Sequence, residues 1–236
     1  MKFYTTILAC FLTFGTTQLK AQQLNQDFGM NQLLRISKQS NANREAVGSH
    51  YLYEKWAPGR LFIRRGDTIS TFKSAFTRYN VKEQQVEIGA AQDSKSSAGF
   101  FDDSILMKFE LVNPKTNKTL SFQRCRNLNL PRGLHGFVEV LYHDKDILFC
   151  KKTFTLVKTS TQNVIGGDNP EDQLVKKKRY YLSINGKTSR LKKSKRFILG
   201  QMGDKASKVK AFAKKNKLRY RRDNDLVKIL EYYNTL

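Results

Sequence analysis

Apolar and polar residues alternate along most of the middle of the chain, in short segments that end at turn-forming residues. TISTFKSAFTRYN alternates around Phe72 and Phe76 and ends at Asn80, and LFIRR and QQVEIGA are shorter segments of the same kind. A period of two residues, with many β-branched and aromatic side chains, is typical of strands. We therefore predict a series of strands between residues 49 and 190.

Turn signals between these segments predict antiparallel hairpins. SILMKFELVNPKTNKTLSFQRC is interpreted as a hairpin whose loop is residues 113–118, where Asn117 can adopt positive φ. GFVEVLYHDKDILFCKKTFTLVK is a second hairpin that turns at residues 143–146. Asn185-Gly186 is the strongest hairpin signal of the chain. The strands should form a curled antiparallel sheet, either a sandwich or an open barrel.

The last fifty residues change to a helical period. Ser194 can cap a short helix that stops at Gly203, and Asp204 can cap the next helix. Asp223 or Asn224 can cap a third, with Asp225 favoured in its first turn by the helix dipole. The apolar residues of this third helix recur at i, i+3, i+4 and i+7, and they form a stripe that should be buried or should face a partner: Leu226, Ile229, Leu230 and Tyr233.

The predicted fold class is therefore α+β, mainly β, with two or three C-terminal helices. We divide the chain into a signal peptide (1–21), a polar leader with at most one short helix (22–48), an antiparallel β-rich domain (49–190) and a basic helical C-terminal segment (191–236). The expected core of the β-rich domain includes the large aromatic residues Trp56, Phe62, Phe137 and Tyr142.

The first 21 residues have the pattern of a secretory signal peptide. Lys2 precedes a short apolar stretch at residues 3–14, and the small residue Ala21 is the expected cleavage position. Cys10 also suggests a lipoprotein start, but the apolar stretch continues beyond it, so we favour a filler role for this cysteine. No later segment has the roughly 20 apolar residues of a membrane helix. The mature protein is expected to be exported, to be soluble, and to be periplasmic, envelope-associated or extracellular.

Export bears on the two cysteines that remain after cleavage. Cys125 and Cys150 each lie near the end of a predicted strand. In an oxidising compartment they could form a disulfide. Two buried, unreactive thiols fit the sequence equally, so both alternatives stay open.

Several motifs, taken in order, resemble a family of secreted proteins of Bacteroidota-type bacteria without established activity. They are GSHYLYEKWAPGRL, TRYNVKEQQVEI, GFVEVLY and KVKAFAKKNKLRYRRDNDLVKILEYYN, and the resemblance covers residues 48–234. It implies a secreted β-rich body with a helical C-terminus, and it implies that RYN is a structural turn. It carries over no catalytic residues.

The same resemblance raises the question of glycosylation, because bacteria of that type attach glycans at Asp followed by Ser or Thr and an apolar residue. The tripeptides DTI and DSI match this pattern and make Thr68 and Ser104 possible glycosylation sites. Ordinary hydroxyl residues at strand edges are the alternative.

Catalytic signatures are few. His50, His135 and His143 have no paired spacing, and His143 with Asp144 and Asp146 is better explained as a polar turn than as a metal site. Asp102 and Asp103 would point to opposite faces of a strand. GKTSR lacks the upstream glycine of a phosphate-binding loop, and there is no nucleophile elbow. We predict no catalytic residues, no metal and no cofactor.

Charge is the strongest remaining signal. The chain carries a formal net charge of +23, and +21 remain after the signal peptide is removed. Residues 176–236 hold 20 Lys and Arg against four acids. Such a segment attracts phosphates, sulfates and carboxylates, with strong salt dependence. The candidate anion-binding residues are Lys176, Lys177, Lys178, Arg179, Arg190, Lys192, Lys193, Lys195, Arg196, Lys214, Lys215, Lys217, Arg219, Arg221 and Arg222.

Three functions are compatible with these features. The first is a secreted, non-enzymatic protein that binds an anionic envelope lipid or glycan through the basic segment. The second is a structural or regulatory module that captures a protein partner through the apolar stripe of the last helix. The third is an uncharacterised hydrolase. A merely solvated basic face is the alternative to the first, and specific nucleic-acid recognition is not expected after export.

Overall fold

The structure is a computed structural model, and it describes residues 46–91, 97–158 and 172–236. The predicted signal peptide and most of the polar leader lie outside the described residues, as does the helix suggested within the leader. The described chain forms one open, antiparallel sheet of ten strands followed by helices, as the alternating pattern predicted. The sandwich alternative is wrong, because all ten strands belong to a single sheet.

The sheet has the strand order β10-β9-β8-β7-β6-β5-β1-β2-β3-β4. It combines two meanders, β1–β4 and β5–β10, which are joined by pairing of β1 with β5. The strands are β1 (Ala57–Arg65), β2 (Thr68–Asn80), β3 (Gln85–Ile88), β4 (Gly99–Phe101), β5 (Leu106–Val112), β6 (Thr119–Arg124), β7 (Phe137–Asp144), β8 (Ile147–Lys158), β9 (Gln173–Ile184) and β10 (Lys187–Arg190). The helices are α2 (Lys195–Gly200), α3 (Ala206–Lys215) and α4 (Asp223–Thr235), with short 3-10 turns at Cys125–Asn127 and Gly203–Lys205.

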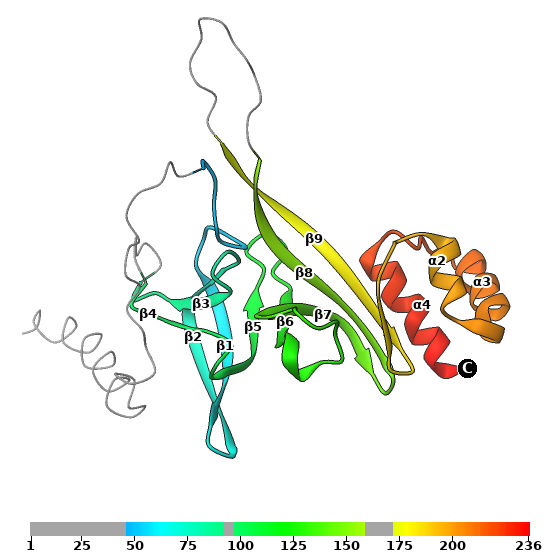
Figure 1. The fold of residues 1–236 in the computed structure, drawn as a ribbon, viewed down its shortest axis with the longest axis horizontal. Helices are drawn as coiled ribbons and strands as arrows, with labels where there is room; N and C mark the ends of the chain where they lie inside the picture. Colours follow the sequence, from blue (N-terminus) through cyan, green and yellow to red (C-terminus); the bar gives the residue numbers. More distant parts are fainter. Residues whose placement is uncertain (1–45, 92–96, 159–171) are drawn as a thin grey trace, which may run out of the picture.

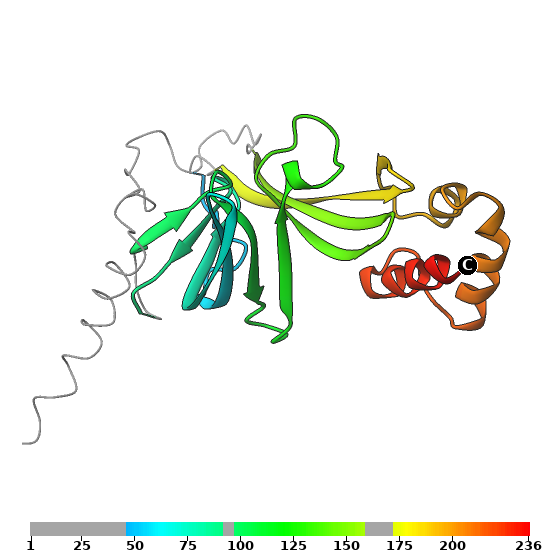
Figure 2. The same ribbon diagram turned by 90° about the horizontal axis from the view of Figure 1, so that it is seen from below.

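The two ends of the sheet have different surroundings. Strands β1–β6 form the curled part of the sheet, whereas β8 and β9 extend as a long ribbon away from them (Figures 1 and 2). The three helices lie at the far end of the molecule, beside the β8–β9 end of the sheet that leads into β10. The C-terminal segment is therefore a packed helical unit rather than a free tail.

The interior of the curled part is an aromatic core. Phe109 and Phe122 face each other on neighbouring strands and stack with ring centroids 4.5 Å apart. Tyr79 lies 5.1 Å and Phe137 also lies 5.1 Å from Phe109, both in tilted or edge-on geometries that aromatic rings favour. All four residues are buried, and Leu61 and Val86 complete the same cluster.

A second apolar cluster joins the helices to the sheet. Ile147 and Phe149 of β8 contribute to it from the sheet, and Ile198 contributes from α2. The stripe of α4 is fully incorporated, since Leu226, Ile229, Leu230 and Tyr233 are all buried in this cluster. The prediction that this stripe is covered is confirmed, and what covers it is this chain's own sheet and helices.

A row of polar residues separates the two clusters on the same face of the sheet. Glu139 of β7 lies opposite Lys151 of β8, and Lys151 lies opposite Tyr180 of β9. The Lys151 ammonium contacts the Glu139 carboxylate at 2.7 Å and approaches Asp223, the first residue of α4, at 4.0 Å. The Tyr180 hydroxyl donates to the same Asp223 carboxylate at 3.2 Å. This row ties the start of α4 to three strands.

On the other face, a buried lysine holds the β2–β3 turn against β7 and β8. Lys152 donates to the backbone oxygens of His135 and Phe137 at 2.6 and 3.0 Å, and to the side-chain oxygen of Gln84. The Tyr79 hydroxyl donates to that same oxygen at 2.8 Å. Desolvation lowers the pKa of Lys152. Its three protons all have acceptors, so this lysine is a structural tie.

Local turn and cap chemistry was predicted well in the hairpins. Asn117, Asn185 and Gly186 all have positive φ, at 53°, 51° and 74°. Ser194 caps α2 by accepting a hydrogen bond from the Phe197 N–H. Asn80 ends β2, and its side-chain oxygen accepts hydrogen bonds from the backbone N–H groups of Lys82 and Glu83. RYN is therefore the start of a turn.

Two expected helix caps and two expected core residues were also wrong; one of these core residues, Tyr142, is only partly buried and packs against the helix cluster. Asp204 lies in a 3-10 turn, and the residue before α3 is Lys205, which makes no side-chain cap. Helix α4 begins after Arg222 without a side-chain cap, because the Asp223 carboxylate instead binds residues of the sheet and Lys193. Phe62 points away from the core that its neighbours in β1 enter, and it contacts Lys108 at 4.9 Å.

No helix in the described parts of the chain is long and apolar enough to cross a membrane.

Candidate anion-binding cleft

The predicted basic residues do not form one surface. Four of the candidates lie on the ribbon half of β9, namely Lys176, Lys177, Lys178 and Arg179, and Arg190 is the last residue of β10. The other ten lie after β10, in or beside the helical unit at the far end of the molecule (Figure 1). Within the helical unit, Lys195 at the start of α2 meets the connection between α3 and α4. The structure thus separates the fifteen candidates into a strand group and a helical group.

A cleft of about 490 Å³ lies where α2 begins and the α3–α4 connection passes. Four of its six lining residues are cations, and all four side chains are exposed. In the described chain none of these four forms an ion pair. The lining residues are Ser194, Lys195, Arg219, Tyr220, Arg221 and Arg222.

The acids beside the cleft are already engaged in the fold. Asp223 accepts from Tyr180 and Lys193, and it faces Lys151. Asp225 accepts the backbone N–H of Arg219 at 2.9 Å, which fixes the connection that carries the arginines. These two acids therefore stabilise the framework, and in the described chain they form no ion pair with the guanidinium groups of the cleft.

Among the fifteen candidates, Lys193 forms an ion pair within the protein. Its ammonium binds the Asp223 carboxylate and lies 4.0 Å from the centre of the Tyr180 ring. Desolvation and the nearby Asp223 charge raise the pKa of Tyr180. Lys193 therefore helps to hold α4 on the sheet, and we remove it from the set of residues that could bind an external anion.

Interleaved aromatic residues do not offer a stacking surface for bases. Tyr181 is buried, and Phe212 stacks on Tyr232 with ring centroids 4.0 Å apart. Tyr220 is half-buried against the helix core. These rings are therefore used inside the fold.

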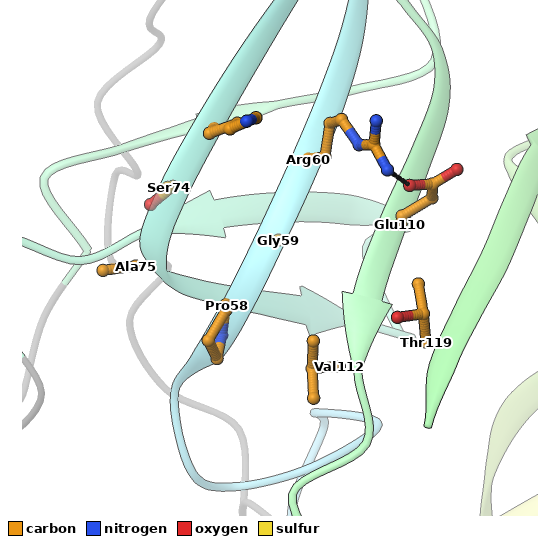
Figure 3. A pocket seen from close by; sticks show the side chains of 9 residues that line it. Pro58, Gly59, Arg60, Ser74, Ala75, Glu110, Val112 and Thr119 are labelled. Carbon is orange, nitrogen blue, oxygen red and sulfur yellow. Dashed lines mark ion pairs between the residues drawn. The ribbon is translucent and has the colours of Figure 1, made fainter. Parts of the chain in front are cut away.

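Another cavity, of about 420 Å³, lies over β1, β2 and β5 (Figure 3). Its carboxylate, Glu110, pairs with Arg60 at 2.7 Å and with Lys108 at 2.9 Å. Burial raises the pKa of Glu110, but the hydrogen bonds and charges of these two partners outweigh burial and leave its pKa below the ordinary value. Ser74 donates to the Phe76 backbone oxygen. The lining residues include no histidine that could activate a hydroxyl group.

The remaining polar candidates have structural contacts. Asp102 and Asp103 lie in the turn after β4 rather than in a strand, which corrects the expectation that they point to opposite faces of one. Asp103 accepts the Gly136 N–H at 3.0 Å. Asp144 accepts from Asn234 of α4 at 2.7 Å. Among the described residues there is no group of three or more His, Cys, Asp and Glu side chains that could hold a metal.

Both possible glycosylation positions are exposed. Thr68 begins β2 and donates to the Arg65 backbone oxygen at 2.9 Å, and Ser104 lies in the β4–β5 turn and donates to Asp102. Nothing in the contacts of either hydroxyl tests the modification, so it stays a prediction.

Cys125 and Cys150 are free and buried in the structure, so the disulfide that the sequence allowed is not formed there. They belong to a small cluster with Val138, Leu148 and Tyr181, and the β6–β7 connection covers it. Burial raises the pKa of Cys125, and burial followed by the proximity of Cys125 raises the pKa of Cys150 to about 12.

The thiols should therefore react slowly in the native protein. With a pKa of about 12, only about one Cys150 thiol in ten thousand is ionised at pH 8, against roughly a quarter for an ordinary cysteine. A disulfide-exchange reagent should label neither residue on the time scale of an exposed thiol, and both after unfolding without reductant. Failure to label the unfolded protein would show that the two cysteines are paired.

Compared with protein-family models, with curated proteins and with solved structures, the chain has no match in any of the three.

Proposed function

We propose that the protein is an exported, non-enzymatic binding protein that holds an anionic component of the cell envelope, a lipid or a glycan, through the cations of its helical C-terminal unit. The observation that carries the proposal is the charge arrangement of this unit. Two of its four acids, Asp223 and Asp225, are engaged in the framework, whereas the cations of the cleft have no ion-pair partner in the described chain. The packed helices present these charges from a fixed framework.

Capture of a protein partner through the α4 stripe has less support. Leu226, Ile229 and Leu230 are buried in the core between α4 and the sheet. A partner could reach them only after α4 had left the sheet, and the polar row at Asp223 opposes that separation. We therefore place binding on the charged side of the helical unit.

The test is a titration of the chain from Gln22 to Leu236 with vesicles, at low and at near-physiological salt. We expect binding to anionic vesicles and none to neutral ones. The affinity should fall as salt rises from about 50 to 150 mM and should remain measurable at the upper value, because bound surface charges are screened only in part. Absence of binding, or its complete loss at about 150 mM salt, would contradict the proposal.

Two triple variants with the same change of charge locate the binding surface. Arg196, Lys215 and Lys217 are exposed in the helical unit, and Lys73, Lys115 and Lys118 are exposed on the β-rich body. Each basic residue near an anionic membrane contributes about 1 kcal/mol. Replacing the first three by Gln should weaken binding at least about tenfold, and replacing the second three should weaken it less than about threefold. Equal losses would mean that net charge alone determines binding.

A further inference from the structure

We propose that the cleft between the start of α2 and the α3–α4 connection is a specific site for a phosphomonoester group carried on a glycerol or sugar headgroup. This inference rests on the proposed function and assigns to it one ligand chemistry and one place. The same cleft is lined by Lys195, at the start of α2, and by three arginines of the α3–α4 connection, Arg219, Arg221 and Arg222.

The kind of cation in the cleft favours phosphate. Three of its four cations are arginines, whose planar guanidinium groups donate two parallel hydrogen bonds to phosphate oxygens, whereas lysine acts as a point charge. A phosphomonoester carries a charge of about −1.5 to −2 at pH 7 and presents three acceptor oxygens. A phosphodiester has one charge and fewer free oxygens, so it can use fewer of these donors.

Neutral donors accompany the cations. The Ser194 oxygen accepts the Phe197 N–H, which leaves the hydroxyl proton of Ser194 free to donate to a ligand. The Tyr220 hydroxyl oxygen is buried and has no hydrogen-bond partner among the described residues. Burial raises the pKa of Tyr220, so its hydroxyl keeps its proton. A buried hydroxyl without a partner is costly in a folded protein, and a ligand acceptor that reached the Tyr220 hydroxyl would remove that cost.

The size of the cleft indicates that more than a phosphate ion would be bound. Its volume of about 490 Å³ lies within the range of about 300–1,000 Å³ of small-molecule sites. The acids nearest in sequence, Asp223 and Asp225, are held by the framework and do not line the cleft. A phosphate can therefore occupy the cationic part while the glycerol or sugar that carries it fills the remainder.

The experiment compares two vesicle compositions with matched zeta potentials, one containing phosphatidic acid, a monoester, and one containing phosphatidylglycerol, a diester. The proteins are the mature chain, the cleft variant Arg219→Gln/Arg221→Gln/Arg222→Gln, and a matched control, Lys208→Gln/Lys210→Gln/Lys214→Gln. The control residues are exposed on α3 and do not line the cleft. Glycerol 3-phosphate serves as a soluble competitor.

We expect the mature chain to bind the monoester vesicles at least about tenfold more tightly than the diester vesicles, and the cleft variant to lose this preference. The control should keep the preference while its binding to both vesicles falls equally. Tyr220→Phe, which preserves the ring in the core, should weaken monoester binding about fivefold. Competition by glycerol 3-phosphate would assign a soluble ligand, and selective vesicle binding without competition would assign the lipid.

Two results overturn the inference and are distinguishable. Equal binding to the two matched vesicles, or an equal loss in the cleft variant and the control, would leave anionic binding in place and remove the phosphomonoester site. If the mature chain binds neither vesicle, the proposed function fails together with the inference. Circular dichroism of each variant verifies that its helices are intact.

Discussion

Replacing Lys151 by Met is expected to destabilise the protein by about 3–5 kcal/mol, because it leaves the Glu139 carboxylate buried without a counter-charge. The side chains of Lys151 and Glu139 are only 11% and 6% exposed, and they lie 2.7 Å apart. The same change also removes the cation that faces Asp223 at the start of α4. Urea unfolding followed by circular dichroism and by the fluorescence of the single tryptophan, Trp56, measures the loss.

The double variant Glu139→Gln/Lys151→Met should recover most of this loss, since no buried charge then remains unpaired. Arg60→Met is the matched control, because it breaks a pair with Glu110 at the same distance of 2.7 Å in which the arginine is 48% exposed. Its expected cost is below about 1 kcal/mol. If Lys151→Met and Arg60→Met cost the same, the polar row does not act as a buried network.

The polar row determines where the helices attach. The apolar residues beside it would allow α4 to slide along the sheet, because hydrophobic contact is not directional. Asp223 removes that freedom, because its carboxylate must meet Tyr180 and Lys193 while it faces Lys151. The cleft residues Arg221 and Arg222 directly precede Asp223, so the same contacts fix their place. We infer that the position of the cleft depends on the buried row.

Local features of the fold were predictable because they depend on neighbouring residues. Asn117 and the Asn185-Gly186 turn tolerate positive φ, so hairpins could be placed around them. The pairing of β1 with β5 was not predictable, because it joins segments separated by three other strands. Strand β4 was missed because its three residues are too short for a periodic pattern. Phe62 was wrongly placed in the core. Leu61 and Phe62 point to opposite faces of β1, and the sequence does not show which of the two faces the interior.

The candidate site was only partly visible in the sequence. The arginines were identified by charge, but the same criterion included Lys193, whose partner Asp223 lies 30 residues further along the chain. The role of Ser194 was recognised only as a cap, although its place beside Lys195 also puts it in the cleft. Distance in the fold, which the sequence does not give, separates the strand group at Lys176 from the helical group. The cap expected at Asp223 failed for the same reason.

Replacing Leu230 by Asp should detach the helical unit from the sheet. Leu230 is completely buried in the cluster that contains Ile147 and Phe149 of β8. The substitution removes a buried leucine, which costs about 2–5 kcal/mol, and it adds the cost of placing a carboxylate in an apolar site. Limited trypsin digestion should then cut the Lys- and Arg-rich residues 200–236 much faster than in the unaltered protein.

Lys228→Asp is the control, because residue 228 lies on the exposed side of the same helix and receives the same carboxylate. It should leave the digestion rate nearly unchanged. The aromatic core around Phe109 is separate from the helix cluster, so Trp56 fluorescence should still report a folded β-rich body in Leu230→Asp. Unchanged protease resistance at residues 200–236 would contradict the burial of the stripe. If resistance is lost but anionic vesicles are still bound as tightly, the charges act as a flexible segment, and the fixed cleft is not needed for binding.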